Sequence, residues 1–153
     1  MEKVEIKKAN KSDLQEILEL QYLAFQSEAK LLDTKDIPPL LQKLSDVEEV
    51  FKNGIILKAV AFNKIIGSVR AKIIDGTTYI EKLFVNPENQ GCGIATSLLL
   101  EIEKYCVTKK YEIYTSTRTL KTIALYEKLG YKKFQEKAFS EKLKFVYLEK
   151  IKE

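Results

Sequence analysis

Three consecutive runs of β-type residues, followed at once by a glycine-rich helix, constrain the fold of this chain more than any other feature. The runs cover residues 55–61, 65–74 and 77–85. Asp75-Gly76 between the last two is a strong signal for a two-residue hairpin turn, so we expect an antiparallel meander. A helical pattern over 91–109 and a strand over 111–117 come next. A strand–helix–strand unit pairs its strands in parallel with a right-handed crossover, which predicts a mixed sheet.

The rest of the chain completes an order of β α α β β β α β α β β. The other predicted elements are a strand at 4–8, a helix at 13–26 capped by Ser12 with Gln15, a short helix opened by Ser45 with Glu48 and closed by Asn53-Gly54, a helix at 120–129 stopped by Gly130, and strands at 131–136 and 143–149. Pro38 and Pro39 show that 27–44 is not one uninterrupted helix. We therefore expect an α/β (α+β) fold, with a mostly antiparallel central sheet of about seven strands and four helices, in one domain over 1–153.

Composition limits the location and the class of protein. The chain has 153 residues, of which 45% are hydrophobic and 31% charged, as in globular proteins. No apolar run is long enough to span a bilayer, and the N-terminal MEKVEIKK lacks the apolar core of a signal peptide. Two cysteines form no disulfide framework, so we expect a cytoplasmic protein.

The absence of histidine removes several chemistries. With no histidine in the chain, Ser-His, Cys-His and His-ligated metal sites are excluded, and no metal site is expected. An acid or base must then be Glu, Asp, Tyr, Lys or Cys. The net charge of +4 is spread over segments in which lysine and glutamate alternate, which disfavours a nucleic-acid-binding surface.

Gly91 and Gly93 stand where the strand at 77–85 passes into the helix at 91–109. The first N–H groups of a helix have no intrahelical partner and attract anions, and glycine lets a phosphate approach them closely. A tight strand-to-helix turn explains the same glycines without a ligand. The spacing fits neither the P-loop nor the dinucleotide-binding fingerprint.

Two segments carry a resemblance to a known family. Gln90-Gly91-Cys92-Gly93-Ile94-Ala95 fits the pattern of Gln or Arg, two residues, Gly, one residue, then Gly or Ala. With the preceding YIEKLFVNPEN it resembles the acetyl-CoA-binding segment of the GCN5-related N-acetyltransferases (GNAT). TIALYEKLGYKKF, which follows later, resembles the second conserved element of that family. The element order, over essentially the whole chain, agrees with the GNAT fold.

The resemblance implies direct transfer of an acetyl group from acetyl-CoA to an amine. It implies that Tyr126 is the acid that protonates the leaving thiolate, and that Glu81 is the base, acting directly or through water. It further implies that the cofactor is bound by Leu83, Phe84, Val85, Gln90, Gly91, Cys92, Gly93, Ile94, Ala95, Thr96 and Thr119. Thr119 stands where many relatives have asparagine, so an amide contact to the cofactor is lost. As plain alternatives, Tyr126 is a packed helix tyrosine and Glu81 a half-exposed strand carboxylate.

The acceptor is expected between 27–44 and the last strands, where Glu28, Asp33 and Asp36 would suit a cationic amine. A small amine is favoured over a peptide amine as the partner, with no nucleic acid and no membrane. A homodimer paired through the last strands is a further possibility. The alternative function is a non-catalytic acyl-CoA-binding or regulatory domain.

Overall fold

The computed structural model describes residues 3–152, so Met1, Glu2 and Glu153 at the ends of the predicted domain lie outside it. Its strands are β1 (Glu5–Lys8), β2 (Ile55–Ala61), β3 (Lys64–Ile74), β4 (Thr77–Val85), β5 (Lys110–Ser116), β6 (Lys132–Ala138) and β7 (Lys144–Ile151). They form one seven-stranded sheet in the order β1-β2-β3-β4-β5-β7-β6. Only β4 and β5 are parallel neighbours. The mixed, mostly antiparallel fold predicted from the sequence is confirmed.

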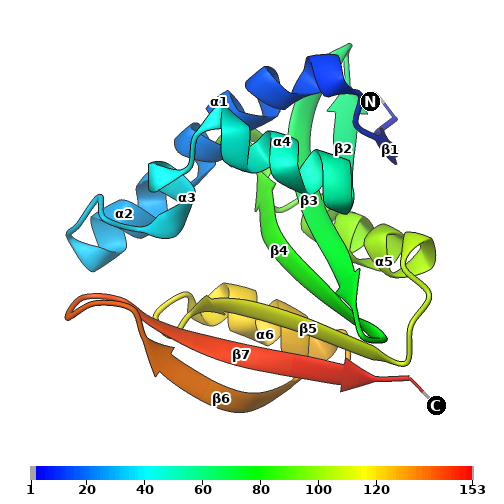
Figure 1. Ribbon diagram of the computed structural model, residues 1–153. Coiled ribbons are helices and arrows are strands. Elements are labelled where there is room, and N and C mark those ends of the chain that lie inside the picture. The colour runs from blue at the N-terminus through cyan, green and yellow to red at the C-terminus, as the bar shows by residue number, and fades with distance from the viewer. Residues whose placement is uncertain (1–2, 153) are drawn as a thin grey trace.

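The helices lie on both faces of this sheet (Figure 1). They are α1 (Leu14–Ala24), α2 (Gln26–Leu32), α3 (Pro38–Leu41), α4 (Leu44–Asn53), α5 (Ile94–Tyr105) and α6 (Leu120–Lys128). The helices α1 and α4 share one hydrophobic cluster with β2 to β4, and α5 and α6 belong to the cluster on the other face. Within the described residues, no helix is long and apolar enough to cross a membrane.

The strands β4 and β5 pair over only part of their length. Their ladder runs from Thr77 opposite Lys110 to Ile80 opposite Ile113, although both strands continue further. Beyond Ile80, β4 carries a bulge, because Arg70 opposes Glu81 whereas Ser68 already opposes Phe84. Lys82 in this bulge has a left-handed φ of 52°. A bulge bends and twists its strand, so β4 turns away from β5, and Figure 1 shows the two strands diverging toward α2 and α3.

The two hairpin turns explain why the bounds of the central strands could be predicted accurately. Asp75 and Gly76 both have positive φ, 48° and 80°, as a type I′ turn requires. Phe62 and Asn63 do the same between β2 and β3, with φ of 52° and 60°. The predicted bounds of β2 and β4 are confirmed, and the other strands differ by one or two residues at their ends.

The helix count differs from the prediction. The segment 27–44, expected to be irregular, contains most of α2 and the single-turn α3, so six helices replace the predicted four within residues 3–152. Asp33, with a left-handed φ of 52°, ends α2. Pro38 occupies the first position of α3, where a missing N–H group costs nothing.

Both predicted capping boxes are wrong in register. The N–H group of Asn10 donates to Asp13 Oδ2 at 2.7 Å, ahead of α1, and the N–H group of Lys43 donates to Asp46 Oδ2 at 2.8 Å, ahead of α4. In each capping box the acceptor is therefore the aspartate three residues after the donor, Asp13 or Asp46. The predicted boxes paired Ser12 with Gln15 and Ser45 with Glu48.

The helix predicted over 91–109 is shorter at both ends, since α5 covers only Ile94–Tyr105. Gly91 and Gly93 have left-handed φ of 81° and 77° and are therefore outside the helix. Tyr105 at its end is 44% exposed, whereas Leu99 and Glu103 are buried. The buried face of α5 thus includes Leu99 and Glu103, and Cys106 directly after the helix is buried as well.

Gly54, between α4 and β2, provides a test of how closely the chain packs against β3. A Cβ atom at Gly54 would lie 2.4 Å from the backbone oxygen of Ala71 on β3, so Gly54→Ala must move backbone. We expect Gly54→Ala to lower the free energy of unfolding by about 1–3 kcal/mol in urea titrations. Gly76→Asn is the control, because its site is open and asparagine tolerates positive φ. Equal stability of the two variants would contradict the packing at Gly54.

Candidate active site

The divergence of β4 and β5 opens a pocket of about 420 Å³. Most of the residues that the sequence singles out line it together: Leu83, Phe84, Val85, Gln90, Gly91, Gly93, Ile94, Ala95, Thr96, Thr119 and Tyr126. Cys92 and Glu81 are not part of its wall. Residues from β4, the loop before α5, β5 and α6 therefore meet in one cavity, with α1 to α3 closing its other end.

One end of the pocket is the N-terminus of α5. The first helical bond at this end is donated by Ser97 N–H to the Gly93 oxygen at 3.1 Å, so the preceding amides have no intrahelical acceptor. A Cβ atom added at Gly91 or Gly93 would meet nothing within 4 Å. The positive φ explains why glycine is favoured there, and free amides at a helix N-terminus suit an anion. Cys92 is a free, exposed thiol beside this loop.

Tyr126 faces the pocket from α6. The side chain is only 3% exposed, and burial raises the pKa of its phenol above the usual value, with Glu28 and Tyr114 adding to the shift. No hydrogen bond contributes to that shift. The hydroxyl is therefore protonated at neutral pH, as a proton donor must be.

Glu81 lies on β4 just before the bulge, and its side chain is 27% exposed. Its carboxylate accepts a 3.4 Å hydrogen bond from the Tyr114 hydroxyl and lies 3.7 Å from Lys82 Nζ and 3.9 Å from Arg70 Nε. Tyr114 and Lys82 line the pocket, but Glu81 does not. Glu81 is thus connected to the pocket through these two neighbours.

Lys82 is a residue of the pocket wall that sequence reasoning missed. The side chain is 5% exposed, and its ammonium donates to the Tyr114 hydroxyl at 3.1 Å. Burial lowers the pKa of Lys82, and Glu81 acts in the opposite direction. Simple alternation along β4 would place Lys82 and Glu81 on opposite faces of the sheet. The bulge breaks this alternation, so the sequence did not show that Lys82 lines the pocket.

Glu28 on α2 is the carboxylate that lines the pocket. Burial raises the pKa of Glu28, and Lys82 partly offsets this increase. The sequence indicated Glu28 only as one acidic residue of an irregular segment. Asp33, named with it, is instead exposed and paired with Lys142 at 3.5 Å.

Thr119 occupies the N-cap position of α6, but its side chain does not cap the helix. Its hydroxyl donates to the Ser116 carbonyl at 2.8 Å and lies 2.8 Å from the Thr115 hydroxyl. These contacts hold the turn between β5 and α6. Within residues 3–152, no group of three or more His, Cys, Asp and Glu side chains could hold a metal ion.

Comparison with known proteins identifies the family. The sequence model of the acetyltransferase (GNAT) family matches residues 13–131. The chain therefore belongs to the GNAT acetyltransferase family, as its two motifs suggested. No curated protein matches the sequence significantly.

Solved structures share the whole fold at low sequence identity. PaiA N-acetyltransferase from Thermoplasma acidophilum, in complex with coenzyme A, is 20% identical, with a TM-score of 0.74 over 97% of this chain and 99% of that one. The ribosomal-protein-S18-alanine N-acetyltransferase from Escherichia coli is 12% identical, with a TM-score of 0.81 over 99% of this chain and 96% of that one. The protein yncA from Salmonella typhimurium, with its cofactor acetyl-CoA, is 17% identical, with a TM-score of 0.75 over 98% and 94%.

Replacing Glu28 with a neutral residue should give a pH-dependent gain in stability. Because burial raises the pKa of Glu28 above 4.5, the folded protein binds the proton more tightly than the unfolded chain. Stability therefore falls as the pH rises from 4.5 through the raised pKa of the folded protein. We expect Glu28→Gln to raise Tm by about 1–3 °C at pH 7.5 and to leave it unchanged near pH 4. Calorimetry with Glu49→Gln, an exposed change on α4, as control checks this. A lower Tm at pH 7.5 would show that the charge of Glu28 is stabilised.

Proposed function

We propose that this protein transfers the acetyl group of acetyl-CoA to a primary amine by direct attack in a ternary complex. The observation that carries the proposal is the single pocket that joins the free amides of α5 to Tyr126 on α6 across the diverging strands. Membership of the acetyltransferase family supports the reaction class. Two structures of the same fold contain coenzyme A or acetyl-CoA, which supports the cofactor.

The residues of the α5 end fit the phosphates of coenzyme A. In this proposal the amides of residues 91–96 and the Thr96 hydroxyl bind the pyrophosphate, so Cys92 contributes through its backbone. Gln90, Ile94 and Ala95 shape the same loop. The unpaired edge of β4 at Leu83, Phe84 and Val85 offers backbone groups to the pantetheine arm, and Thr119 offers a hydroxyl from the opposite wall.

Bound acetyl-CoA supplies the electrophilic thioester and a thiolate leaving group. Tyr126, protonated because burial raises the pKa of its phenol, donates a proton to the departing sulfur. The Val85 N–H group is our candidate donor to the thioester oxygen as charge develops there. Both groups act in a largely buried site, where hydrogen bonds to developing charge are strong.

At the other end of the pocket, two carboxylates have separate roles in this proposal. Glu28 lies in the pocket wall and holds the ammonium group of the acceptor. Glu81 is the base and receives the amine proton through water, because it reaches the pocket only beside Lys82 and Tyr114. The acceptor is a primary amine, with a small molecule favoured over a peptide.

We also propose a cytoplasmic location and a possible homodimer. Both cysteines are free, which suits a reducing compartment. The strand β6 is an edge of the sheet, and Phe139 beside it is exposed, although Val146 is buried. An open edge supports pairing across a two-fold axis, which sedimentation velocity can test.

Replacing Tyr126 tests the chemistry. We expect Tyr126→Phe to lower kcat about 100-fold or more in an assay of CoA release with a panel of amines, because the proton donor is lost. Tyr105→Phe, on the exposed side of α5, should retain wild-type kcat. Saturable CoA binding by the wild type without turnover of any amine would instead favour the non-catalytic acyl-CoA-binding alternative.

Replacing Gly93 tests the phosphate site. A methyl group at Gly93 strains a left-handed residue and adds bulk to the loop of free amides, so Gly93→Ala should weaken CoA binding about 10-fold in calorimetry. Gly76→Ala is a matched control, because Gly76 has a similar φ of 80° and equally open surroundings in a distant hairpin. The phosphate assignment is wrong if both variants bind CoA like the wild type.

A further inference from the structure

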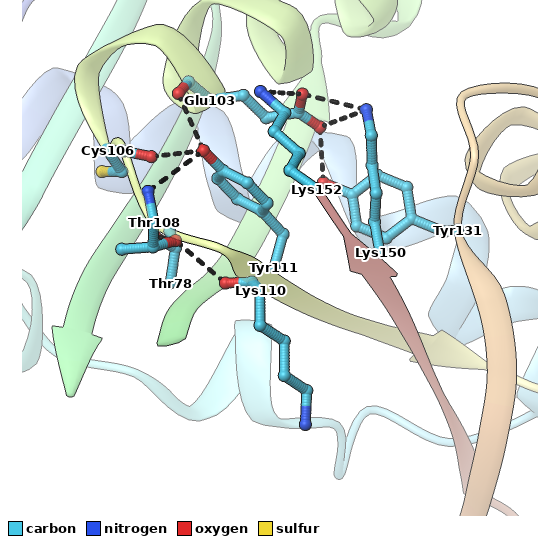
Figure 2. A network of polar contacts seen from close by, with 9 residues as sticks. All are labelled: Thr78, Glu103, Cys106, Thr108, Lys110, Tyr111, Tyr131, Lys150 and Lys152. Carbon is cyan, nitrogen blue, oxygen red and sulfur yellow. Dashed lines mark hydrogen bonds and ion pairs between the residues drawn. The ribbon is translucent and has the colours of Figure 1, made fainter. Parts of the chain in front are cut away.

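Glu103 is a buried charge that the proposed mechanism does not use. It lies on the inner side of α5 and is 4% exposed, the only buried carboxylate in the part of the chain that the structure describes. Figure 2 shows that its carboxylate is the centre of a polar network. The Tyr131 hydroxyl donates to Oε2 at 2.7 Å, and Lys150 Nζ donates to both oxygens at 3.0 and 3.1 Å. Lys152 Nζ adds a third cationic contact at 3.6 Å.

The network joins α5, β5 and β7 with the chain that follows α6. Glu103 belongs to α5, Tyr131 follows α6, and Lys150 belongs to β7. From β5, the Tyr111 hydroxyl is shared by the backbone oxygens of Glu103, at 3.2 Å, and of Cys106, at 2.6 Å. The network therefore fixes the C-terminal end of α5 relative to the chain that leaves α6.

Stability alone does not account for a charge at this position. Removing a carboxylate and an ammonium from water is unfavourable, and well-packed apolar residues often stabilise a core as well as a buried ion pair does. What a carboxylate adds is direction, because charge-assisted hydrogen bonds are short and restrict the geometry of their donors. Of these donors, Tyr131 is the one next to the pocket residue Tyr126.

Tyr131 contacts Tyr126 in two ways. Its N–H group donates to the Tyr126 carbonyl at 3.0 Å, and the two rings pack with centroids 6.2 Å apart and an interplanar angle of 54°. Lys150 Nζ lies 5.5 Å from the centroid of the Tyr131 ring, so this ring is held by its hydroxyl, by Lys150 and by Tyr126 together. Packing against the Tyr131 ring therefore restricts how the Tyr126 ring can be oriented.

We propose that Glu103, acting through Tyr131, is a positioning residue that holds Tyr126 in the orientation needed to protonate the leaving thiolate. This inference rests on the proposed acetyltransferase function and on Tyr126 as its acid. The residue lies on the helix whose N-terminus forms the proposed phosphate site. One helix thus carries both the proposed phosphate site and the support of the proposed acid.

The test uses variants that remove single groups. Tyr131→Phe deletes the hydroxyl and keeps the ring, and we expect kcat to fall about 10-fold with the KM for acetyl-CoA within twofold of wild type. Glu103→Ala should have a similar effect, whereas Glu103→Gln, which still accepts a hydrogen bond, should retain more of kcat. Tyr111→Phe is the matched control, since it removes an equally buried hydroxyl that donates to backbone oxygens and not to the Glu103 carboxylate. It should lower Tm and leave kcat unchanged.

A double-mutant cycle separates positioning from general destabilisation. If Glu103 and Tyr131 act through Tyr126, Tyr131→Phe should cause no further loss of kcat in the Tyr126→Phe protein. An equal loss in both backgrounds, or a wild-type kcat in Tyr131→Phe, overturns the proposal while leaving the acetyltransferase function intact. Wild-type protein that turns over no amine would instead contradict the proposed function. A crystal structure of Tyr131→Phe tests the positioning itself without any turnover, since an unmoved Tyr126 ring overturns the proposal and a rotated ring shows that Tyr131 orients Tyr126.

Discussion

The bulge at Lys82 is the feature on which the pocket depends. It adds one residue to β4 opposite β3, and it comes directly after the last parallel pair, Ile80 with Ile113. Parallel neighbours that continued to Val85 and Ser116 would satisfy each other's backbone groups and leave no space between them. Because the bulge turns β4 away, one strand edge stays free, and the helices after β4 and β5 begin on opposite sides of a cavity.

The ends of this divergence are held by different kinds of interaction. On the paired side, the Thr78 and Thr108 hydroxyls lie 2.7 Å apart, and the network around Glu103 connects α5 with the chain after α6. On the open side, the walls include the end of β4 at Leu83, Phe84 and Val85 and the glycine loop, and the hydrogen bond from Lys82 to the Tyr114 hydroxyl joins β4 to β5. The paired part of β4 and β5 is thus held rigidly, and this fixes the distance between the two walls of the pocket. A ligand that contacts both walls requires such a fixed distance.

The sequence predicted what depends on local chemistry. The bounds of β2 and β4 were correct because alternation and the Asp75-Gly76 turn are local signals, and Gly91 and Gly93 marked the start of α5. The capping residues were wrong because Asp13 and Asp46 compete with Gln15 and Glu48 for the same role, and sequence spacing cannot rank them. Lys82 in the pocket wall was missed for a different reason, and Glu28 was indicated only as one of three acidic residues near the expected acceptor. A bulge changes which side chains share a face, and Glu28 reaches the cavity only through the packing of α2.

The packing of α2 and α3 also bears on how amino-acid substitutions can change the cavity. Ala29, Leu32 and Ile37 form a small hydrophobic cluster with Leu143, separate from the two clusters that cover the faces of the sheet. Substitutions in this cluster leave the larger cores and the glycine loop untouched. Substitutions around Glu28 can therefore reshape this end of the cavity while the packing that holds its other end stays the same.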